Sequence, residues 1–318
     1  MRRAIMMQRA EDITIGQAFE EFICEKKVMK LAKETIKSYQ GRFKTFTDFL
    51  PADTPCRDIS DRTIIRFIEF LQIRNPNIKT VSINTNVRHL RTIFYSFMEL
   101  GYMDKFKIKL LKCEEDLIEV YSDAELGRLL KKPDKKKCSF AQYRNWVMVC
   151  FLLGTAIRLD TINNLKIDDV DFENHEVKLR KVKSKKAYTI PLSSTLEKTL
   201  IAYIRVRKGK PDDYLFCNQY GEQLQKDSIT TAICRYNHSR GVLKTSVHLF
   251  RHTFAKNWIL NKGDAFRLKA ILGHSTMAMV NVYVGMWGKD LHKDFDDFNP
   301  LEKMRGVIGE REAIRMGR

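Results

Sequence analysis

Apolar residues recur at intervals of three and four along most of the first hundred residues, and this spacing predicts helices rather than strands. Thr14 and Gln17 have the spacing of a capping box at the start of the first helix, and Gly101 can end the last one. The apolar stripes are Phe19, Phe22 and Ile23; Ile36, Tyr39, Phe43 and Phe46; Ile64, Phe67, Ile68 and Leu71; and Val87, Leu90, Ile93, Phe94 and Phe97. We therefore predict a compact helical domain over residues 12–104.

The pattern changes after this region. Residues 105–120 show no clean helical period, and we predict a linker there. Ser122 and Glu125 begin a second domain over residues 121–288, with a helix that ends near Gly154. The stretches "HEVKLRKV" and "KAYTIPL" alternate apolar and polar residues around a basic turn, which predicts a β-hairpin before further helices. The fold class we expect is mainly α with a small β-sheet (α+β), followed by a tail over residues 289–318.

The chain of 318 residues carries 57 Lys and Arg against 39 Asp and Glu, a formal net charge of +18. Such an excess favours nucleic acid as the partner and an anionic membrane surface as the second choice. The longest apolar run, Trp146 to Gly154, is too short to span a bilayer, and the first residues lack the apolar core of a signal peptide. Seven cysteines without a C-x-x-C pair indicate reduced thiols and no zinc site. We expect a cytoplasmic, nucleoid-associated protein with no membrane contact.

Several basic residues of the helical domain lie off the apolar stripes. They form either an ordinary solvated face or a face that contacts DNA phosphates, and the net charge favours the second interpretation. These candidates for DNA binding are Lys37, Arg42, Lys44, Arg88 and Arg91. The basic loop "KKPDKKK", residues 131–137, has the same two interpretations.

Four short stretches of the second domain carry groups suited to chemistry: "GTAIRLDTI", "RKVKSKKAYTIPL", "HLFRHTFA" and "ILGHSTMAMVNVY". Each group alone has an ordinary explanation, such as a helix cap, a solvated lysine, a turn histidine or a packed tyrosine. The groups are, in chain order, Arg158, Lys183, His248, Arg251, His274 and Tyr283. Three basic groups crowded into "HLFRH" favour an anion at that point.

Taken together, the order Arg, Lys, His-x-x-Arg, Leu-Gly-His, Tyr resembles the tyrosine recombinases of the phage-integrase family. The resemblance covers nearly the whole chain, and it is closest to simple two-domain members such as mobile-element integrases and recombinases that resolve chromosome dimers. It implies a SAM-like core-binding domain and a catalytic domain that form a C-shaped clamp around double-stranded DNA. It also implies strand cleavage and rejoining without a metal, ATP or any other cofactor.

The resemblance assigns a role to each group. Tyr283 is the nucleophile that forms a 3′-phosphotyrosine, and Arg158 and Arg251 hold the phosphate and favour the ionised phenol. His248 contacts the phosphate and assists proton transfer, and His274 positions it. The general acid is Lys183, aligned backwards from "IPL", with Lys181 and Lys185 as close alternatives. Lys181 and Lys185 are also candidates for DNA binding.

Three further residues are expected to support these six groups without contacting the phosphate. His252 is expected to pack and hydrogen-bond without touching the phosphate. The family usually has an acid three positions after the first arginine, where this chain has Thr161. We expect either Asp160 or Thr161 to take its place.

The apolar residues of the tail suggest docking onto a neighbouring protomer, which fits a homotetramer on DNA. They are Leu291, Phe295, Phe298 and Leu301. Two other functions remain open: an enzyme that nicks and reseals one duplex like a type IB topoisomerase, and a DNA-binding regulator without catalysis. The intact set of Arg158, Arg251, His274 and Tyr283 argues against the regulator. The apolar tail argues against the topoisomerase.

Overall fold

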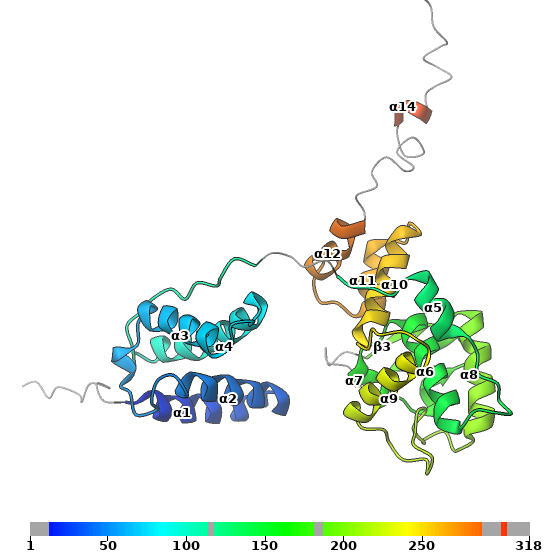
Figure 1. The fold of residues 1–318 in the computed structure, drawn as a ribbon, viewed down its shortest axis with the longest axis horizontal. Coiled ribbons are helices and arrows are strands. Elements are labelled where there is room, and N and C mark those ends of the chain that lie inside the picture. Colours follow the sequence, from blue (N-terminus) through cyan, green and yellow to red (C-terminus); the bar gives the residue numbers. More distant parts are fainter. Residues whose placement is uncertain (1–12, 114–117, 181–186, 288–299, 304–318) are drawn as a thin grey trace, which may run out of the picture. The chain divides into compact units, whose positions relative to one another are not determined.

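The computed structural model of the protein describes residues 13–113, 118–180, 187–287 and 300–303 (Figure 1). The chain divides into two units, Met1–Asp116 and Leu117–Arg318. Each unit has its own hydrophobic core, so each is described by itself.

The first unit is a bundle of four helices, drawn in blue and cyan in Figure 1. They are α1 (Ile15–Val28), α2 (Lys33–Thr47), α3 (Asp61–Arg74) and α4 (Thr80–Glu99), with a short 3-10 turn, η1 (Cys56–Asp58), before α3. The four helices coincide with the four apolar stripes of the sequence. Thr14 and Gln17 form the predicted capping box, and Gly101 follows the end of α4 with a φ of +76°, a conformation that suits glycine.

Aromatic side chains fill the core of this bundle. The ring of Phe46 lies 5.1 Å from that of Phe67 and 5.2 Å from that of Phe94, both edge to face. All three rings are fully buried. Burial of a phenylalanine side chain stabilises a fold by about 1.5–3 kcal/mol, so this cluster ties α2, α3 and α4 together.

The predicted linker is only partly a linker. Ile108 is buried in the first core, and the side chain of Asn84 exchanges hydrogen bonds of 2.8 and 2.9 Å with the backbone of Leu111. Just past the predicted linker, Tyr121 is buried in the second unit, where its backbone N–H donates to Thr253 Oγ1 at 2.9 Å. An extended segment can bury single apolar residues without a helical period, which explains why the sequence pattern did not reveal these contacts.

The second unit is mostly helical around a small sheet. Its helices are α5 (Asp123–Leu130), α6 (Phe140–Thr155), α7 (Leu159–Ile162), α8 (Ser194–Arg207), α9 (Lys226–Ser239), α10 (His248–Leu260), α11 (Ala265–Leu272), α12 (Ala278–Trp287) and α14 (Pro300–Lys303), with a 3-10 turn, η2 (Ile167–Asp169). The strands β1 (Val170–Asp171), β2 (Glu176–Leu179) and β3 (Tyr188–Pro191) form an antiparallel sheet in that order. The pairing of Leu179 with Tyr188 confirms the predicted hairpin. Strand β1 was not predicted because two residues are too few to show alternation.

The apolar run from Trp146 to Gly154 lies in α6, which is buried on nearly all sides. Its residues Val147, Met148, Val149 and Phe151 are fully enclosed by the second core. A helix that is hydrophobic all round belongs in the middle of a domain, and α6 packs against α8, α9 and α10. Among the described helices, none combines the length and the apolarity needed to cross a membrane.

Candidate active site

Helix α10 carries the basic cluster that the sequence singled out. Residues three and four positions apart share a helix face, so His248, Arg251 and His252 project toward neighbouring turns. His248 is the first residue of the helix and is exposed, whereas Arg251 is 5% exposed. The cluster therefore runs from the solvent edge of the unit into its interior.

The guanidinium of Arg251 is held by the ends of two other helices. It donates to Ala156 O at 2.8 Å and to Leu272 O at 2.7 Å, and it lies 2.6 Å from His274 Nε2. Ala156 ends α6 and Gly273 ends α11, both in the left-handed conformation, with φ values of +53° and +58°. Carbonyl groups at helix C-termini carry partial negative charge, so they hold a cation without neutralising it.

Both side chains of this contact keep a defined charge state. Burial, followed by the charge of Arg158, lowers the pKa of Arg251 to about 10, so Arg251 stays charged at neutral pH. Burial, followed by Arg251 and Arg158, lowers the pKa of His274 to about 4, so His274 is neutral and accepts from Arg251 through Nε2. Its proton is then on Nδ1, which is buried and has no hydrogen-bond partner among the described residues.

Arg158 also contacts the turn that follows α11, through the carbonyl of Gly273. It follows the end of α6, and both of its terminal nitrogens lie 3.4 Å from Gly273 O, a long contact that holds the group loosely. Two guanidinium groups therefore converge on the Leu272–His274 turn. Two like charges this close repel each other, and an anion placed between them would remove the repulsion.

Tyr283 stands beside the two arginines in the same unit. Helix α12 places it in a small apolar cluster with Ala255, Leu268 and Val280, and its side chain is 5% exposed. Its hydroxyl lies 2.9 Å from His252 Nδ1, and its ring is parallel to that of His274 with centroids 6.5 Å apart. Helices α10, α11 and α12 pack against one another, which sets this geometry (Figure 1).

The phenol of Tyr283 is not activated in advance. Burial raises its pKa, and the charges of Arg251 and Arg158 oppose this effect without overcoming it. The two arginines therefore favour the ionised phenol, as expected, but burial has the larger effect on its pKa.

His252 is neutral at the site. Burial lowers its pKa, and His248 and Arg251 add to the shift, so His252 can accept the phenol proton. His252, expected to pack and hydrogen-bond without touching the phosphate, contacts the hydroxyl of Tyr283 directly.

The side chain of Asp160 lies at the surface of the second unit. Its carboxylate pairs with Lys226 of α9 at 2.5 Å, and both side chains are about half exposed. Thr161 is buried, and its backbone N–H donates to Arg158 O at 2.9 Å. The carboxylate of Asp160 thus lies at the surface in this structure. A role for Asp160 or Thr161 in place of the acid stays a prediction.

Several predicted residues lie outside the described parts of the chain. These are the three lysines of the basic turn, Lys181, Lys183 and Lys185, and the tail residues Leu291, Phe295 and Phe298. For Leu301, only the backbone is described, within α14.

The basic residues proposed for the first unit lie off its core. Lys37, Lys44 and Arg88 are exposed and Arg91 is partly buried. Arg42 is tied to α4 by a hydrogen bond of 3.3 Å to Asn86 Oδ1. They are therefore available on the surfaces of α2 and α4.

One side chain at the site was not predicted. Tyr188 begins β3, and its phenol end approaches Gly273, close enough that a methyl group on Gly273 would come 2.8 Å from the hydroxyl. Strand alternation would have placed Tyr188 on the same face as the buried Ile190, but the sequence did not reveal what that face packs against.

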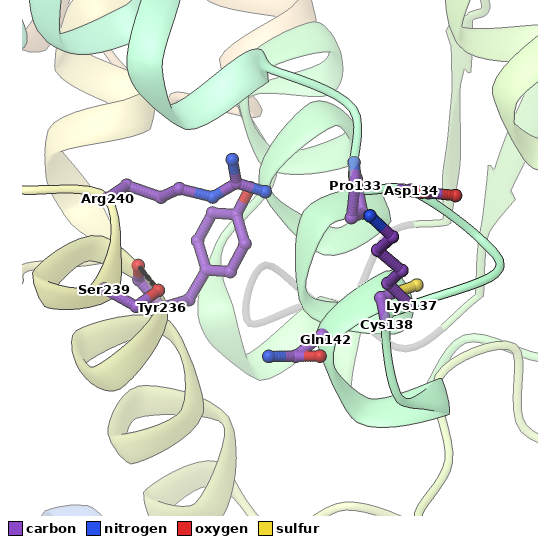
Figure 2. Close-up of a pocket in the computed structure, with 8 residues that line it drawn as sticks. All are labelled: Pro133, Asp134, Lys137, Cys138, Gln142, Tyr236, Ser239 and Arg240. Carbon is purple, nitrogen blue, oxygen red and sulfur yellow. Dashed lines mark hydrogen bonds between the residues drawn. The ribbon is translucent and has the colours of Figure 1, made fainter.

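A groove lies beside the basic loop, and its lining does not include the arginine pair. Figure 2 shows this groove of about 330 Å³, with Arg240 over the ring of Tyr236 on one side and Pro133, Asp134 and Lys137 on the other. Of the remaining loop lysines, Lys132 lies 5.8 Å from the ring of Trp146 and Lys135 5.0 Å from that of Tyr143. The groove shares no residue with the cluster around Arg251.

The arrangement around Arg251 suits an anion and a nucleophile. The groups that the sequence predicted are two guanidiniums, three imidazoles and one phenol, to which the structure adds the phenol of Tyr188. Guanidinium groups bind a tetrahedral phosphate through charge-assisted hydrogen bonds. The described parts of the chain contain no group of three or more His, Cys, Asp or Glu side chains placed to bind a metal ion.

Comparisons with known proteins identify the family of this chain. Residues 119–286 match the phage integrase family, and residues 14–113 match the phage integrase SAM-like domain. A tyrosine recombinase of Pseudothermotoga lettingae is 27% identical over 90% of this chain and 98% of its own length. The tyrosine recombinase XerA of Pyrococcus furiosus is 25% identical over 92% of this chain and 97% of its own length.

Solved structures show the same fold. The Tn1549 transposon integrase in complex with transposon right end DNA has a TM-score of 0.73 at 17% identity, over 93% of this chain and all of that one. A lambda integrase dimer bound to a core site has a TM-score of 0.67 at 15% identity, over 84% of this chain and 97% of that one. The family match spans more than half of the chain and includes the turn, helices and tyrosine described above. The chain belongs to the phage integrase family of tyrosine recombinases.

Proposed function

We propose that this chain is a site-specific DNA recombinase that cleaves and rejoins DNA strands through Tyr283. One observation carries the proposal: a buried phenol lies beside two guanidiniums of its own unit, with a histidine at its hydroxyl. Neutral acceptors hold Arg251, which leaves its charge for a phosphate. The DNA-bound integrases of similar fold and the net charge of +18 support DNA as the partner.

The proposed cleavage step exchanges one phosphate ester for another. The hydroxyl of Tyr283 gives up its proton, and its oxygen attacks the scissile phosphorus while the bond to the 5′-oxygen breaks. Arg158 and Arg251 stabilise the charge that builds up on the non-bridging oxygens. The product is a 3′-phosphotyrosine and a free 5′-hydroxyl. Because the ester energy is kept in the protein–DNA bond, rejoining requires no nucleotide.

Protons move between groups at the site. His252, which contacts the phenol, accepts its proton when the phosphate is bound. Burial, His248 and Arg251 lower the pKa of His252 in the free protein, and the negative charge of the phosphate offsets the two charges among these causes. The leaving 5′-oxygen takes a proton from a lysine of the basic turn, for which Lys183 is our first choice and Lys181 and Lys185 the alternatives. His248, exposed at the entrance, assists this transfer, and His274 offers its unpaired Nδ1–H to a phosphate oxygen.

Recombination between two duplexes cuts four strands, so it requires four nucleophiles. Each protomer holds Tyr283 and both arginines in one unit, which makes one active site per protomer. We therefore propose a tetramer on DNA, assembled in part through the tail with its apolar residues. In the first unit, Lys37, Arg42, Lys44, Arg88 and Arg91 would contact DNA phosphates and set the salt dependence of binding.

A suicide-substrate assay tests the proposal. DNA from the flanks of the native gene, nicked so that the cleaved fragment diffuses away, should trap a covalent adduct that peptide mass spectrometry maps to Tyr283. Tyr283→Phe should give no adduct while it still binds the DNA. Tyr220→Phe is the matched control, because Tyr220 is exposed and remote in sequence from the cluster, and it should react like the wild type.

The other two functions predict different results. A DNA-binding regulator would bind this DNA and form no adduct with the wild-type chain. An enzyme that only nicks and reseals would relax a supercoiled plasmid without any target site and would give no exchanged product. Either outcome would contradict the proposed recombinase.

A further inference from the structure

Tyr188 occupies a special position in the hairpin. It is the first residue of β3, pairs with Leu179 across the sheet, and lies two positions after residues 181–186, which contain the three candidate lysines. It lies on the same side of the strand as Ile190, which is buried. The strand therefore directs the Tyr188 side chain into the unit rather than to solvent.

The phenol end of Tyr188 meets the turn that both arginines use. A methyl group on Gly273 would come 2.8 Å from the Tyr188 hydroxyl and 3.0 Å from Cζ, so only a glycine permits this approach. Glycine also suits the φ of +58° at this position. The carbonyl of the same Gly273 receives both contacts from Arg158, and the next residue is His274.

The hydroxyl of Tyr188 is protonated and available. Burial raises its pKa, and Arg251 and Arg158, whose charges both act on it, lower the pKa by less. Among the residues that the structure describes, this hydroxyl has no hydrogen-bond partner. A half-buried O–H donor near two cations is suited to an acceptor that carries negative charge.

We propose that Tyr188 binds the scissile phosphate and donates a hydrogen bond to one of its non-bridging oxygens. This inference rests on the proposed function and adds a second phenol with a different role to the same site. The hydroxyl of Tyr283 is oriented by His252 for attack, whereas that of Tyr188 lies at the Gly273 turn, beside the arginines that fix the oxygens. Tyr188 thus helps to orient the phosphorus toward the nucleophile.

Tyr188→Phe tests this role because it removes the hydroxyl and keeps the ring against Gly273. A hydrogen bond to a charged group is worth enough that single-turnover cleavage at saturating DNA should slow by about 10- to 100-fold. The affinity for uncleaved DNA should stay within about twofold, since many other phosphate contacts remain. Tyr220→Phe again serves as the matched control and should leave both quantities unchanged.

A modified substrate separates a phosphate contact from a packing effect. A methylphosphonate at the scissile position replaces one non-bridging oxygen by a methyl group, and the two diastereomers replace different oxygens. With one diastereomer, the wild type should lose the contribution of Tyr188, and Tyr188→Phe should then cleave at the wild-type rate. With the other diastereomer, the variant should remain slower than the wild type.

Each other outcome overturns the inference. Tyr188→Phe could cleave normally while the wild type forms its adduct at Tyr283, which would refute the role of Tyr188 and leave the recombinase intact. The loss could persist with both diastereomers, which would show an effect through packing. The adduct could move to Tyr188 in Tyr283→Phe, which would make Tyr188 a nucleophile. Failure of the wild type to form any adduct would instead refute the proposed function itself.

Discussion

The first unit buries apolar side chains, whereas the second unit also buries arginines. Among the described residues of the first unit, the buried polar side chains are those of Asn84 and Asn86, and Asn84 satisfies the backbone of a neighbouring segment. The second unit buries Arg144 and Arg251, a far more costly choice. Burial of a charge is unfavourable unless the charge is held by partners, so the surroundings of these two arginines distinguish the second unit.

The two buried arginines differ in what surrounds them. Arg144 donates to Cys217 O at 2.8 Å and to the side chain of Asn145, and Arg251 donates to two helix-terminal carbonyls. Both are held by neutral acceptors, and burial lowers the pKa of each. The charge of Arg158 acts on Arg251, however, and that repulsion persists until an anion binds. A buried cation can be structural, but a pair of cations on one turn indicates a ligand.

The largest expected effect tests whether the hydrophobic cores of the two units are independent of each other. Phe94→Ala should destabilise this unit by about 3–5 kcal/mol, because it leaves a cavity among three packed rings. Hydrogen exchange should show faster exchange in α4 and unchanged exchange in α10. Ile73→Ala, at an exposed position, should change stability by less than about 0.5 kcal/mol. Equal weakening of α4 and α10 would show that the two cores do not act independently.

The second prediction distinguishes the two arginines. Arg251→Lys keeps a charge but loses the planar fork, so we expect cleavage of the suicide substrate to fall by about 10²- to 10³-fold. Arg144→Lys is the matched control: it should lower the melting temperature but leave the cleavage rate per folded molecule unchanged. If Arg144→Lys slowed cleavage as much as Arg251→Lys, the distinction between a structural and a functional cation would be wrong.

The smallest predicted effect concerns pH. His274 has a pKa of about 4 in the folded chain against 6.5 as its ordinary value, so the unfolded chain takes up a proton first on acidification. The stability that neutral His274 contributes is complete above about pH 6.5 and is lost as the pH falls toward 4. Between pH 7.5 and 5, the wild type should lose on the order of 5 °C more in melting temperature than His274→Gln. An equal loss in both would mean that other groups, such as His252, set the acid response.

The sequence predicted most of the architecture for a simple reason. Helices α1 to α4 have long apolar stripes, and their period of three and four is a local property that packing does not change. The hairpin was visible from alternation, and the capping boxes at Thr14 and Ser122 from their spacing. Elements without such local signals were missed: β1 is two residues long, and α7 is a single turn.

The predicted site residues were found by their order along the chain, yet their partners were not. Arg251 and Ala156 are 95 positions apart, and Arg158 and Gly273 are 115 apart. Nothing in the local pattern says that Asp160 turns toward Lys226, or that Tyr188 lies against Gly273. These relations arise when helix ends far apart in sequence pack together.

The sequence by itself determined which groups are candidates for the chemistry: two arginines, three histidines, a basic turn and a tyrosine. The tertiary structure alone decided the contacts and charge states of those candidates that it describes. Burial of Arg251 at two helix ends, of His274 beside it and of Tyr283 against His252 depends on long-range packing. A periodic pattern reports which face of an element is buried, but the protonation of a buried group depends on what that face meets.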